Sequence, residues 1–277
     1  MLIPAAEASP LRPAVAAVSL RNLSRGFKSE SGAYIAVKDI NLEVEAGRFL
    51  SLVGPSGCGK STILNMIAGL LMPSTGAVEV FGTPLHGLNK RASYMFQQDS
   101  LLPWKTVEEN IALGLEFRRK QRREALECAG AWIRRVGLEG FEKSYPYQLS
   151  GGMRKRVSMA QSWIVDPDII LMDEPFGALD VHTRQRMEGQ ILDLWAGSGK
   201  TVLFITHDLE EAIALSDQVI VLSAGPASRI VGGHNVDLPR PRNLMDIKTD
   251  PRFAELYRTI WSDLRQEVLK SYDRSHA

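Results

Sequence analysis

The chain has 277 residues, of which 44% are hydrophobic and 23% charged, and its formal net charge is +1. This length supports one large domain or two small ones, and the near-neutral balance argues against a broad nucleic-acid-binding surface. The cysteines Cys58 and Cys128 lie far apart and have no CxxC pattern or histidine nearby. Neither a disulfide framework nor a metal site built on cysteine is therefore expected, and a reducing cytoplasm fits best.

Residues 1–16 are expected to form a flexible N-terminus. They contain three prolines and lack the basic start and apolar core of a secretory signal. No run of about 18 apolar residues occurs in the sequence, so we do not expect the chain to span a membrane by itself.

Two alternating segments, at 18–23 and 34–44, predict strands joined by a turn over 29–32. Phe27 lies just before this turn and ahead of a glycine-rich loop, where an aromatic ring can stack on an adenine base. Tyr34 is the alternative for that role, and simple core packing is the alternative reading of Phe27.

The glycine-rich loop at residues 54–62 fits the phosphate-binding pattern of Gly, four residues and Gly-Lys-Ser/Thr. The apolar run 49–53 predicts a buried strand before it, and residues 62–68 predict a helix that Gly69 could cap. Glycines let N–H groups converge on phosphates, and the helix N-terminus adds partial positive charge. The residues expected to contact the nucleotide are Gly54, Pro55, Ser56, Gly57, Cys58, Gly59, Lys60, Ser61 and Thr62.

Three side chains of this loop have expected roles of their own. Lys60 should reach the β- and γ-phosphates, and the Ser61 hydroxyl should be a ligand of Mg²⁺. Cys58 lies at the helix N-terminus, where the thiolate is favoured, so its alkylation should inactivate the protein and ATP should protect it.

The middle of the chain predicts a helical insertion. Strands are expected at 77–81 and 93–96, just before Gln97, and residues 107–119 and 122–136 have helical spacing with many charged side chains. Ser150 is then a natural N-cap for a helix that begins with two glycines.

Two acids end the next buried strand, predicted over 169–174. Parallel strands present functional groups at their carboxyl ends, so Asp173 is expected to hold Mg²⁺ through water and Glu174 to polarise the attacking water. Another buried strand, over 201–205, precedes His207, which is placed to touch the γ-phosphate. Taken singly, the acids could simply begin a loop and the histidine could be structural.

The C-terminal part begins with a helix predicted over 183–195 and strands over 218–222 and 229–231. Residues 251–268 place apolar side chains at i, i+3, i+4, i+7, i+8 and i+11, which predicts an amphipathic helix with Asp250 as its N-cap. Core packing is the simpler expectation for this helix, and docking on a partner is the alternative.

Taken in order, these motifs resemble the ATP-binding subunit of an ABC transporter over residues 18–231. The resemblance implies an α/β fold with a P-loop NTPase (RecA-like) core, an antiparallel β subdomain and a helical subdomain at about 98–158. It implies an ABC-type nucleotide-binding domain over 17–231 and a C-terminal extension over 232–277 that contains the amphipathic helix.

The resemblance also assigns roles to residues whose own signals are weak. The matched positions are the adenine-stacking aromatic Phe27, the Q-loop residue Gln97, the signature residues Ser150, Gly151, Gly152 and Met153, the D-loop residue Asp180 and the switch histidine His207. Gln97 would touch Mg²⁺ and the membrane partner, and Met153 stands where Gln is commoner. Glu174 would be the general base.

The implied cofactors are ATP and Mg²⁺, with each ATP held between the phosphate loop of one subunit and the signature motif of another. The implied partners are a second ATP-binding subunit, expected to be an identical chain, transmembrane permease subunits and, indirectly, a periplasmic solute-binding protein, with no nucleic acid. The implied location is peripheral, on the cytoplasmic face of the inner membrane.

Residues 101–104, Leu-Leu-Pro-Trp, and 176–180 are similar to importers of nitrate, sulfonate, taurine and related small solutes. Two alternatives stay open: a soluble ABC-type ATPase acting on nucleic acid or ribosomes, and the motor of an efflux or lipid transporter. The stretch from Gln97 to Ser150 has no heptad repeats and each motif occurs once, which favours the importer over the soluble ATPase.

Overall fold

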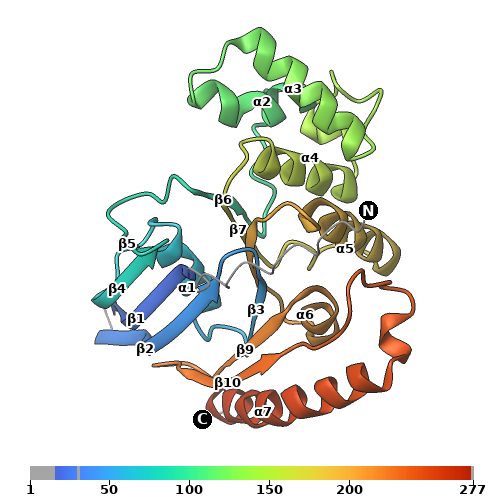
Figure 1. Cartoon of the computed structure of the whole chain (residues 1–277). Coiled ribbons are helices and arrows are strands. Elements are labelled where there is room, and N and C mark those ends of the chain that lie inside the picture. The colour runs from blue at the N-terminus through green and yellow to red at the C-terminus, as the bar shows by residue number, and fades with distance from the viewer. Residues whose placement is uncertain (1–15, 30–31, 276–277) are drawn as a thin grey trace, which may run out of the picture.

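A six-stranded sheet forms the core of the structure (Figure 1), a computed structural model that describes residues 16–29 and 32–275. Its order is β10-β9-β3-β8-β7-β6, and every neighbouring pair is parallel except β10 and β9. The strands are β3 (Phe49–Val53), β6 (Ala92–Met95), β7 (Ile169–Asp173), β8 (Thr201–Ile205), β9 (Gln218–Leu222) and β10 (Ile230–Asn235). The N-terminus expected to be flexible lies outside the described residues except for Ala16.

A four-stranded antiparallel sheet, ordered β2-β1-β4-β5, lies beside the first helix. Its strands are β1 (Ala16–Ser29), β2 (Gly32–Glu45), β4 (Thr75–Val80) and β5 (Thr83–Pro84), and the helix is α1 (Lys60–Ile67). β1 and β2 are longer than predicted because their pairing continues beyond the alternating apolar positions to Ser29 and Gly32. The turn predicted over 29–32 includes residues 30–31, which lie outside the described ranges.

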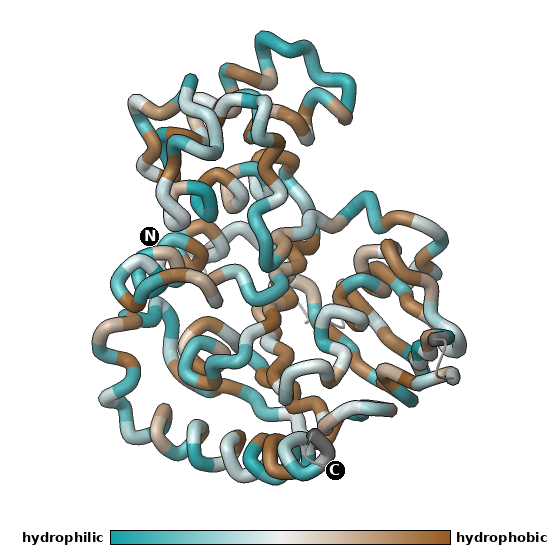
Figure 2. The backbone as a smooth tube through the Cα atoms, turned by 180° about the vertical axis from the view of Figure 1, so that it is seen from behind, coloured by the Kyte–Doolittle hydropathy of each residue, from teal (hydrophilic) through white to brown (hydrophobic). Residues whose placement is uncertain are grey.

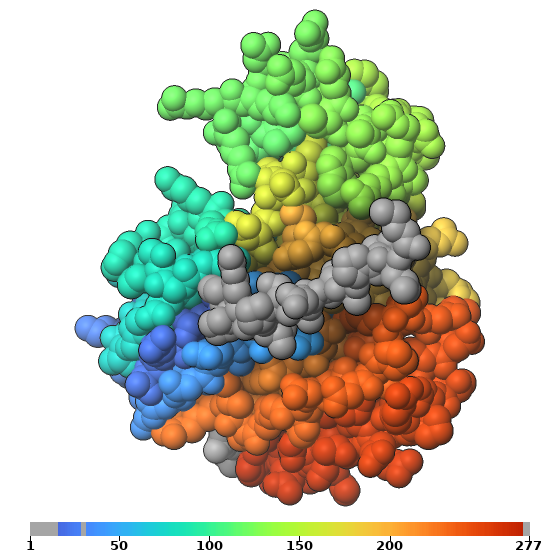
Figure 3. All heavy atoms as spheres, viewed as in Figure 1, coloured from blue at the N-terminus to red at the C-terminus, as the bar shows by residue number. Residues whose placement is uncertain are grey.

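The helical insertion projects from the six-stranded sheet (Figures 1 and 3). It consists of α2 (Val107–Phe117), α3 (Arg122–Arg135), the 3₁₀ helix η1 (Pro146–Gln148) and α4 (Gly151–Trp163). α2 begins at a capping box, in which the Thr106 hydroxyl accepts from the Glu109 N–H and the Glu109 carboxylate accepts from the Thr106 N–H. α4 continues beyond residue 158, and Trp163 at its end is buried in the core.

Both faces of the six-stranded sheet are covered, as the apolar runs of its strands predict. In β7, Ile169 and Leu171 pack with α1 and the antiparallel sheet, whereas Ile170 and Met172 pack with the helical insertion. Because side chains alternate between the faces of a strand, functional groups on β7 are confined to its carboxyl end, where the strand leaves the core.

The remaining helices are α5 (Val181–Trp195), α6 (Leu209–Leu215), the 3₁₀ helix η2 (Ile247–Thr249) and α7 (Pro251–Ser275). Phe253, Ile260 and Leu264 of α7 pack against α6 and β9, and hydrophilic and hydrophobic residues alternate along the helix (Figure 2). Asp250 caps α7 by accepting from the Arg252 N–H at 2.9 Å. The apolar face of α7 thus packs in the core.

The predicted end of the nucleotide-binding domain, residue 231, lies inside a strand, because β10 continues to Asn235. Within the described ranges, no helix has the length and apolar character that crossing a membrane requires.

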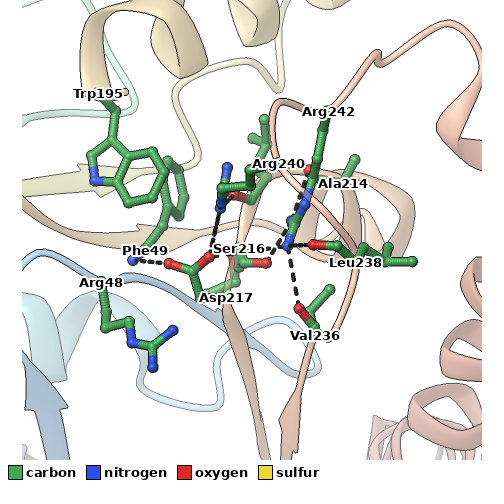
Figure 4. Close-up of polar contacts among 12 residues, drawn as sticks. Arg48, Phe49, Trp195, Ala214, Ser216, Asp217, Val236, Leu238, Arg240 and Arg242 are labelled. Carbon is green, nitrogen blue, oxygen red and sulfur yellow. Dashed lines mark hydrogen bonds and ion pairs between the residues drawn. The ribbon is translucent and has the colours of Figure 1, made fainter. Parts of the chain in front are cut away.

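A buried arginine connects the C-terminal extension to the end of α6 (Figure 4). The Arg242 side chain is 1% exposed, and burial lowers its pKa to about 10, so it stays a cation at neutral pH. It donates at 2.6–3.3 Å to the carbonyls of Ile213, Ala214, Ser216, Val236 and Leu238. The first three lie at the C-terminal end of α6, where a helix leaves its last carbonyls unpaired.

Replacing Arg242 with Met is expected to lower the free energy of unfolding by roughly 2–4 kcal/mol, because several buried carbonyls lose their donor while an unbranched apolar stem is kept. Urea unfolding followed by circular dichroism measures the change. Arg252→Met is the control, since Arg252 is exposed and pairs with Asp250 at the surface, and it should leave stability nearly unchanged. Equal midpoints for the two variants would contradict the structural role of Arg242.

Candidate active site

The phosphate-binding loop connects β3, a central strand of the sheet, to α1. Gly59 is the N-cap of α1 and has a φ of +93°, a left-handed conformation that favours glycine. A Cβ at Gly59 would lie 2.4 Å from a methyl group of Val37 in β2, so only glycine lets the loop pass this strand. The N–H groups of the first turn have no partner within α1, which makes this helix start an anion-binding position.

Lys60 lies inside the curl of this loop. Its ammonium group donates to the carbonyls of Gly54 at 2.8 Å and Pro55 at 3.1 Å, and the residue is 6% exposed. A cation held beside a helix N-terminus adds to the positive potential there and can bind phosphate oxygens.

Cys58 is buried behind the loop, which corrects the expectation of a reactive thiol. Burial raises the pKa of the thiol, and this effect outweighs the opposing charge of Lys60. The position of Cys58 at a helix N-terminus was visible in the sequence, but the direction of its side chain toward the core was not.

We therefore expect a neutral maleimide to modify Cys58 more slowly than the partly exposed Cys128, both with and without ATP. Mass spectrometry of peptides from a labelling time course measures the two rates, and urea-unfolded protein, in which both thiols should react alike, is the control. Preferential labelling of Cys58 in the folded chain would contradict its burial.

Asp173 lies at the carboxyl end of β7, next to the loop. Its carboxylate accepts a hydrogen bond from Ser61 and, at 3.2 Å, from the Tyr94 hydroxyl. Burial raises the pKa of Asp173, and both hydrogen bonds oppose that rise. A carboxylate beside a hydroxyl is an oxygen-donor set of the kind that Mg²⁺ prefers, so these two residues fit such an ion.

Two of the other predicted side chains contact Glu174. Gln97 donates its amide N–H to Glu174 Oε2 at 3.3 Å, and His207 Nδ1 lies 3.4 Å from the same oxygen. Gln97 follows β6 and His207 follows β8, so the ends of three adjacent strands meet here. Glu174 itself has a φ of +43°, a strained conformation for a residue with a side chain, and its N–H donates to the Ile205 carbonyl. A carboxylate held in this way can accept a proton from water.

Phe27 and Tyr34 face each other across β1 and β2. Their rings stack with centroids 5.7 Å apart, and the Arg25 guanidinium lies 4.8 Å from the Phe27 ring centre. Tyr34 is 48% exposed. The two aromatics considered for adenine stacking therefore belong to one stack, on the strand pair that reaches the loop at Val37.

The signature residues and the D-loop aspartate both begin helices. Ser150 caps α4 by accepting from the Met153 N–H at 3.3 Å, and Asp180 caps α5 by accepting from the Thr183 N–H at 3.0 Å. Gly152 lies against α5, since a Cβ there would be 2.6 Å from the Thr183 methyl group. Hydrogen bonds from backbone groups lower the pKa of Asp180, so it caps as a carboxylate.

These helix starts are separated from the phosphate loop. Across residues 16–29 and 32–275, no hydrogen bond or ion pair joins residues 150–153 or Asp180 to residues 54–62. Figure 1 likewise shows α4 in the insertion, away from α1. One chain alone thus brings together Lys60, Ser61 and the strand-end cluster, but leaves the signature motif outside it.

Two polar residues near the site were not anticipated from the sequence. Lys155 of α4 is 4% exposed and donates to the carbonyls of Phe96 at 3.3 Å and Gln97 at 2.6 Å, which anchors the signature helix to the Q-loop residue. Lys155 shares one helix face with the buried Met159 and Trp163, and this spacing was the signal that could have found it. Tyr94, which contacts Asp173, had no such signal.

Comparison with known proteins bears on these observations. A family model described as ABC transporter matches residues 37–177. An ABC transporter ATP-binding protein of Methanocaldococcus jannaschii is 44% identical over 254 residues, which is 92% of this chain and 93% of that protein. The taurine import ATP-binding protein TauB of Escherichia coli strain K12 is 40% identical over 245 residues, which is 84% of this chain and 93% of that protein.

The fold is also similar to that of solved ATP-binding cassettes. The dimeric structure of an ATP-binding cassette in a post-hydrolysis state, bound to ADP and Pi, has a TM-score of 0.71 at 31% identity and covers 80% of this chain and 100% of that one. A phosphate loop between a central strand and its helix, with the helical insertion, defines a P-loop ATPase cassette. The chain belongs to the ABC transporter family. It is an ATP-binding subunit in which ATP hydrolysis is coupled to transport, and the fold expected from the resemblance is confirmed.

Proposed function

We propose that this chain powers the import of a small solute, of the nitrate, sulfonate or taurine kind, through a separate membrane-spanning permease. In this proposal the chain itself lies at the cytoplasmic face of the inner membrane. The import direction rests on the similarity to the taurine import protein. The catalytic mechanism rests on one geometric observation, that the Glu174 carboxylate lies between Gln97 and His207 at the end of β7.

Within one subunit, each group of the cluster has a separate task. Lys60 and the start of α1 bind the phosphates of ATP, and the Phe27 ring stacks on the adenine. Glu174 accepts the proton of the attacking water, while Gln97 and His207 orient its carboxylate. When bound at Asp173, Ser61 and Gln97, Mg²⁺ neutralises charge on the phosphates.

Hydrolysis involves two copies of the chain in this proposal. Residues Ser150, Gly151, Gly152 and Met153 form a second anion-binding helix start, at α4, that lies apart from α1 of the same chain. An identical partner places this start over the ATP, with its Asp180 at the same contact. ATP then joins the two subunits, and its hydrolysis lets them separate.

The helical insertion carries this movement to the permease. A recess of about 490 Å³ lies between the insertion and the antiparallel-sheet side of the molecule (Figure 3). Its lining includes exposed apolar side chains, those of Leu70, Leu88, Phe96 and Phe117. Exposed apolar side chains that gather in one place mark a protein contact, so we place the permease in this recess. The periplasmic solute-binding protein acts through the permease, and no nucleic acid takes part.

Affinity purification of the tagged chain from detergent-solubilised membranes tests this proposal. Mass spectrometry should identify a membrane-spanning permease among the co-purifying proteins, encoded beside a periplasmic-type binding protein whose solute can then be screened. Recovery of ribosomal or DNA-repair proteins in place of a permease would favour a soluble ABC-type ATPase and contradict the proposal.

A pair of surface variants tests the docking recess. Phe117→Asp places a charge on an exposed residue of the recess and should abolish co-purification of the permease while ATP binding persists. Met245→Asp is the matched control, because Met245 is also largely exposed but lies next to α5, outside the recess. Equal permease recovery with both variants would show that the contact lies elsewhere.

A further inference from the structure

Tyr94 connects the metal-binding carboxylate to the strand that leads into the Q-loop. It lies in β6, opposite Leu171 of β7 in the parallel register, and its side chain reaches past that neighbour to the strand end. The Tyr94 hydroxyl donates to Asp173 Oδ2 at 3.2 Å. This contact joins two of the three strand ends from which the catalytic cluster is built.

The phenol is the donor in this contact, because an ionised carboxylate can only accept hydrogen bonds. A half-buried phenol beside a carboxylate has no other function in the hydrolysis described above. A hydroxyl that donates to a carboxylate oxygen in this way fixes the orientation of that carboxylate.

Asp173 is thereby held from two sides. The Ser61 hydroxyl approaches from α1, and the Tyr94 hydroxyl approaches from β6. An ionised carboxylate has about four acceptor positions on its two oxygens, so it can accept both hydrogen bonds and still hold an ion or its bound water. Hydrogen bonds of this type fix the direction of a ligand, and their removal typically costs 10–100-fold in metal affinity.

The position of the phenol is itself fixed by a stacked ring. Tyr94 and Phe96 point to the same side of the strand, and their rings stack with centroids 4.2 Å apart and an interplanar angle of 21°. Both rings line the recess in which we place the permease. A residue of the recess lining, Tyr94, therefore contacts the Asp173 carboxylate directly, and Phe96 packs on that residue.

We propose that Tyr94 is a positioning residue for Asp173, which holds the carboxylate ready for Mg²⁺ and links its orientation to the Phe96 side of the recess. The inference rests on the proposed function, since it requires that Asp173 hold the Mg²⁺ that accompanies ATP. It assigns to Tyr94 no contact with the nucleotide and no proton transfer.

The test compares nucleotide affinity with and without the metal. Tyr94→Phe removes one hydroxyl and keeps the stacked ring, and a fluorescent, non-hydrolysable ATP analogue reports binding in saturating Mg²⁺ and in EDTA. We expect the affinity in Mg²⁺ to fall about tenfold and the affinity in EDTA to stay unchanged. Tyr257→Phe on α7, remote from the site, is the matched control and should change neither value.

Two outcomes overturn the inference. They are an unchanged affinity of Tyr94→Phe in Mg²⁺ and an equal loss in Mg²⁺ and EDTA, which would indicate a purely structural role. If Tyr94→Phe does not fold, Phe96→Leu is measured instead, because it keeps the Tyr94 hydroxyl but removes the ring stacked on it. A loss of analogue affinity in Mg²⁺ but not in EDTA supports the inference, and an unchanged affinity in Mg²⁺ refutes it. Failure of the parent chain to bind the analogue would instead refute the proposed function itself.

Discussion

The Glu174→Gln variant is expected to hydrolyse ATP about 10²–10⁴-fold more slowly than the parent chain, with little change in ATP affinity. The amide has the shape of the carboxylate but cannot take a proton from water. The substitution also changes the group that Gln97 and His207 contact, because both side chains lie within 3.4 Å of Glu174 Oε2 in the parent. Steady-state release of phosphate measures the rate.

Glu210→Gln provides the control for this substitution. Glu210 is an exposed carboxylate at the start of α6, three positions beyond His207, and it pairs with Lys248. Its replacement should leave hydrolysis close to the parent rate. If Glu174→Gln hydrolysed ATP as fast as Glu210→Gln, Glu174 would not be the general base.

The Lys60→Met variant is expected to bind ATP about 10–100-fold more weakly. Methionine keeps most of the side-chain length but removes the cation that lies within the loop, and a charged hydrogen bond is worth roughly 1.5–3 kcal/mol. Equilibrium binding of a fluorescent ATP analogue measures the loss.

Lys143→Met is the matched control for charge removal, because Lys143 is 80% exposed and lies in the helical insertion. This variant should bind the analogue with the parent affinity. Parent-like binding by Lys60→Met as well would mean that the loop amides alone hold the phosphates.

Much of the site was predictable because its signals are local. The phosphate loop combines a strand, a glycine-rich turn and a helix within about twenty residues, and β8 has the bounds that its apolar run predicts. The N-caps Ser150 and Asp250 were also found from sequence, since a cap depends on side chains only two or three residues away. The roles of the individual site residues in catalysis stay predictions.

The remainder depends on contacts between distant segments. One of the two donors to Asp173 is Tyr94, and no spacing rule connects these positions. The five carbonyls around Arg242 come from two segments, the end of α6 and the stretch after β10, so sequence could not show that this arginine is buried. Cys58 was misjudged for the same reason, because burial against the sheet outweighs the local effect of the helix start.

The measurement that most directly tests the account is the mass of the Glu174→Gln variant in solution, determined by light scattering with and without MgATP. Two chains should close around ATP when hydrolysis is blocked, because the signature helix start lies apart from the phosphate loop of its own chain. We predict the mass of one chain without nucleotide and of two chains with MgATP. The mass of a single chain under both conditions, at ATP concentrations that saturate binding, would contradict the proposed mechanism.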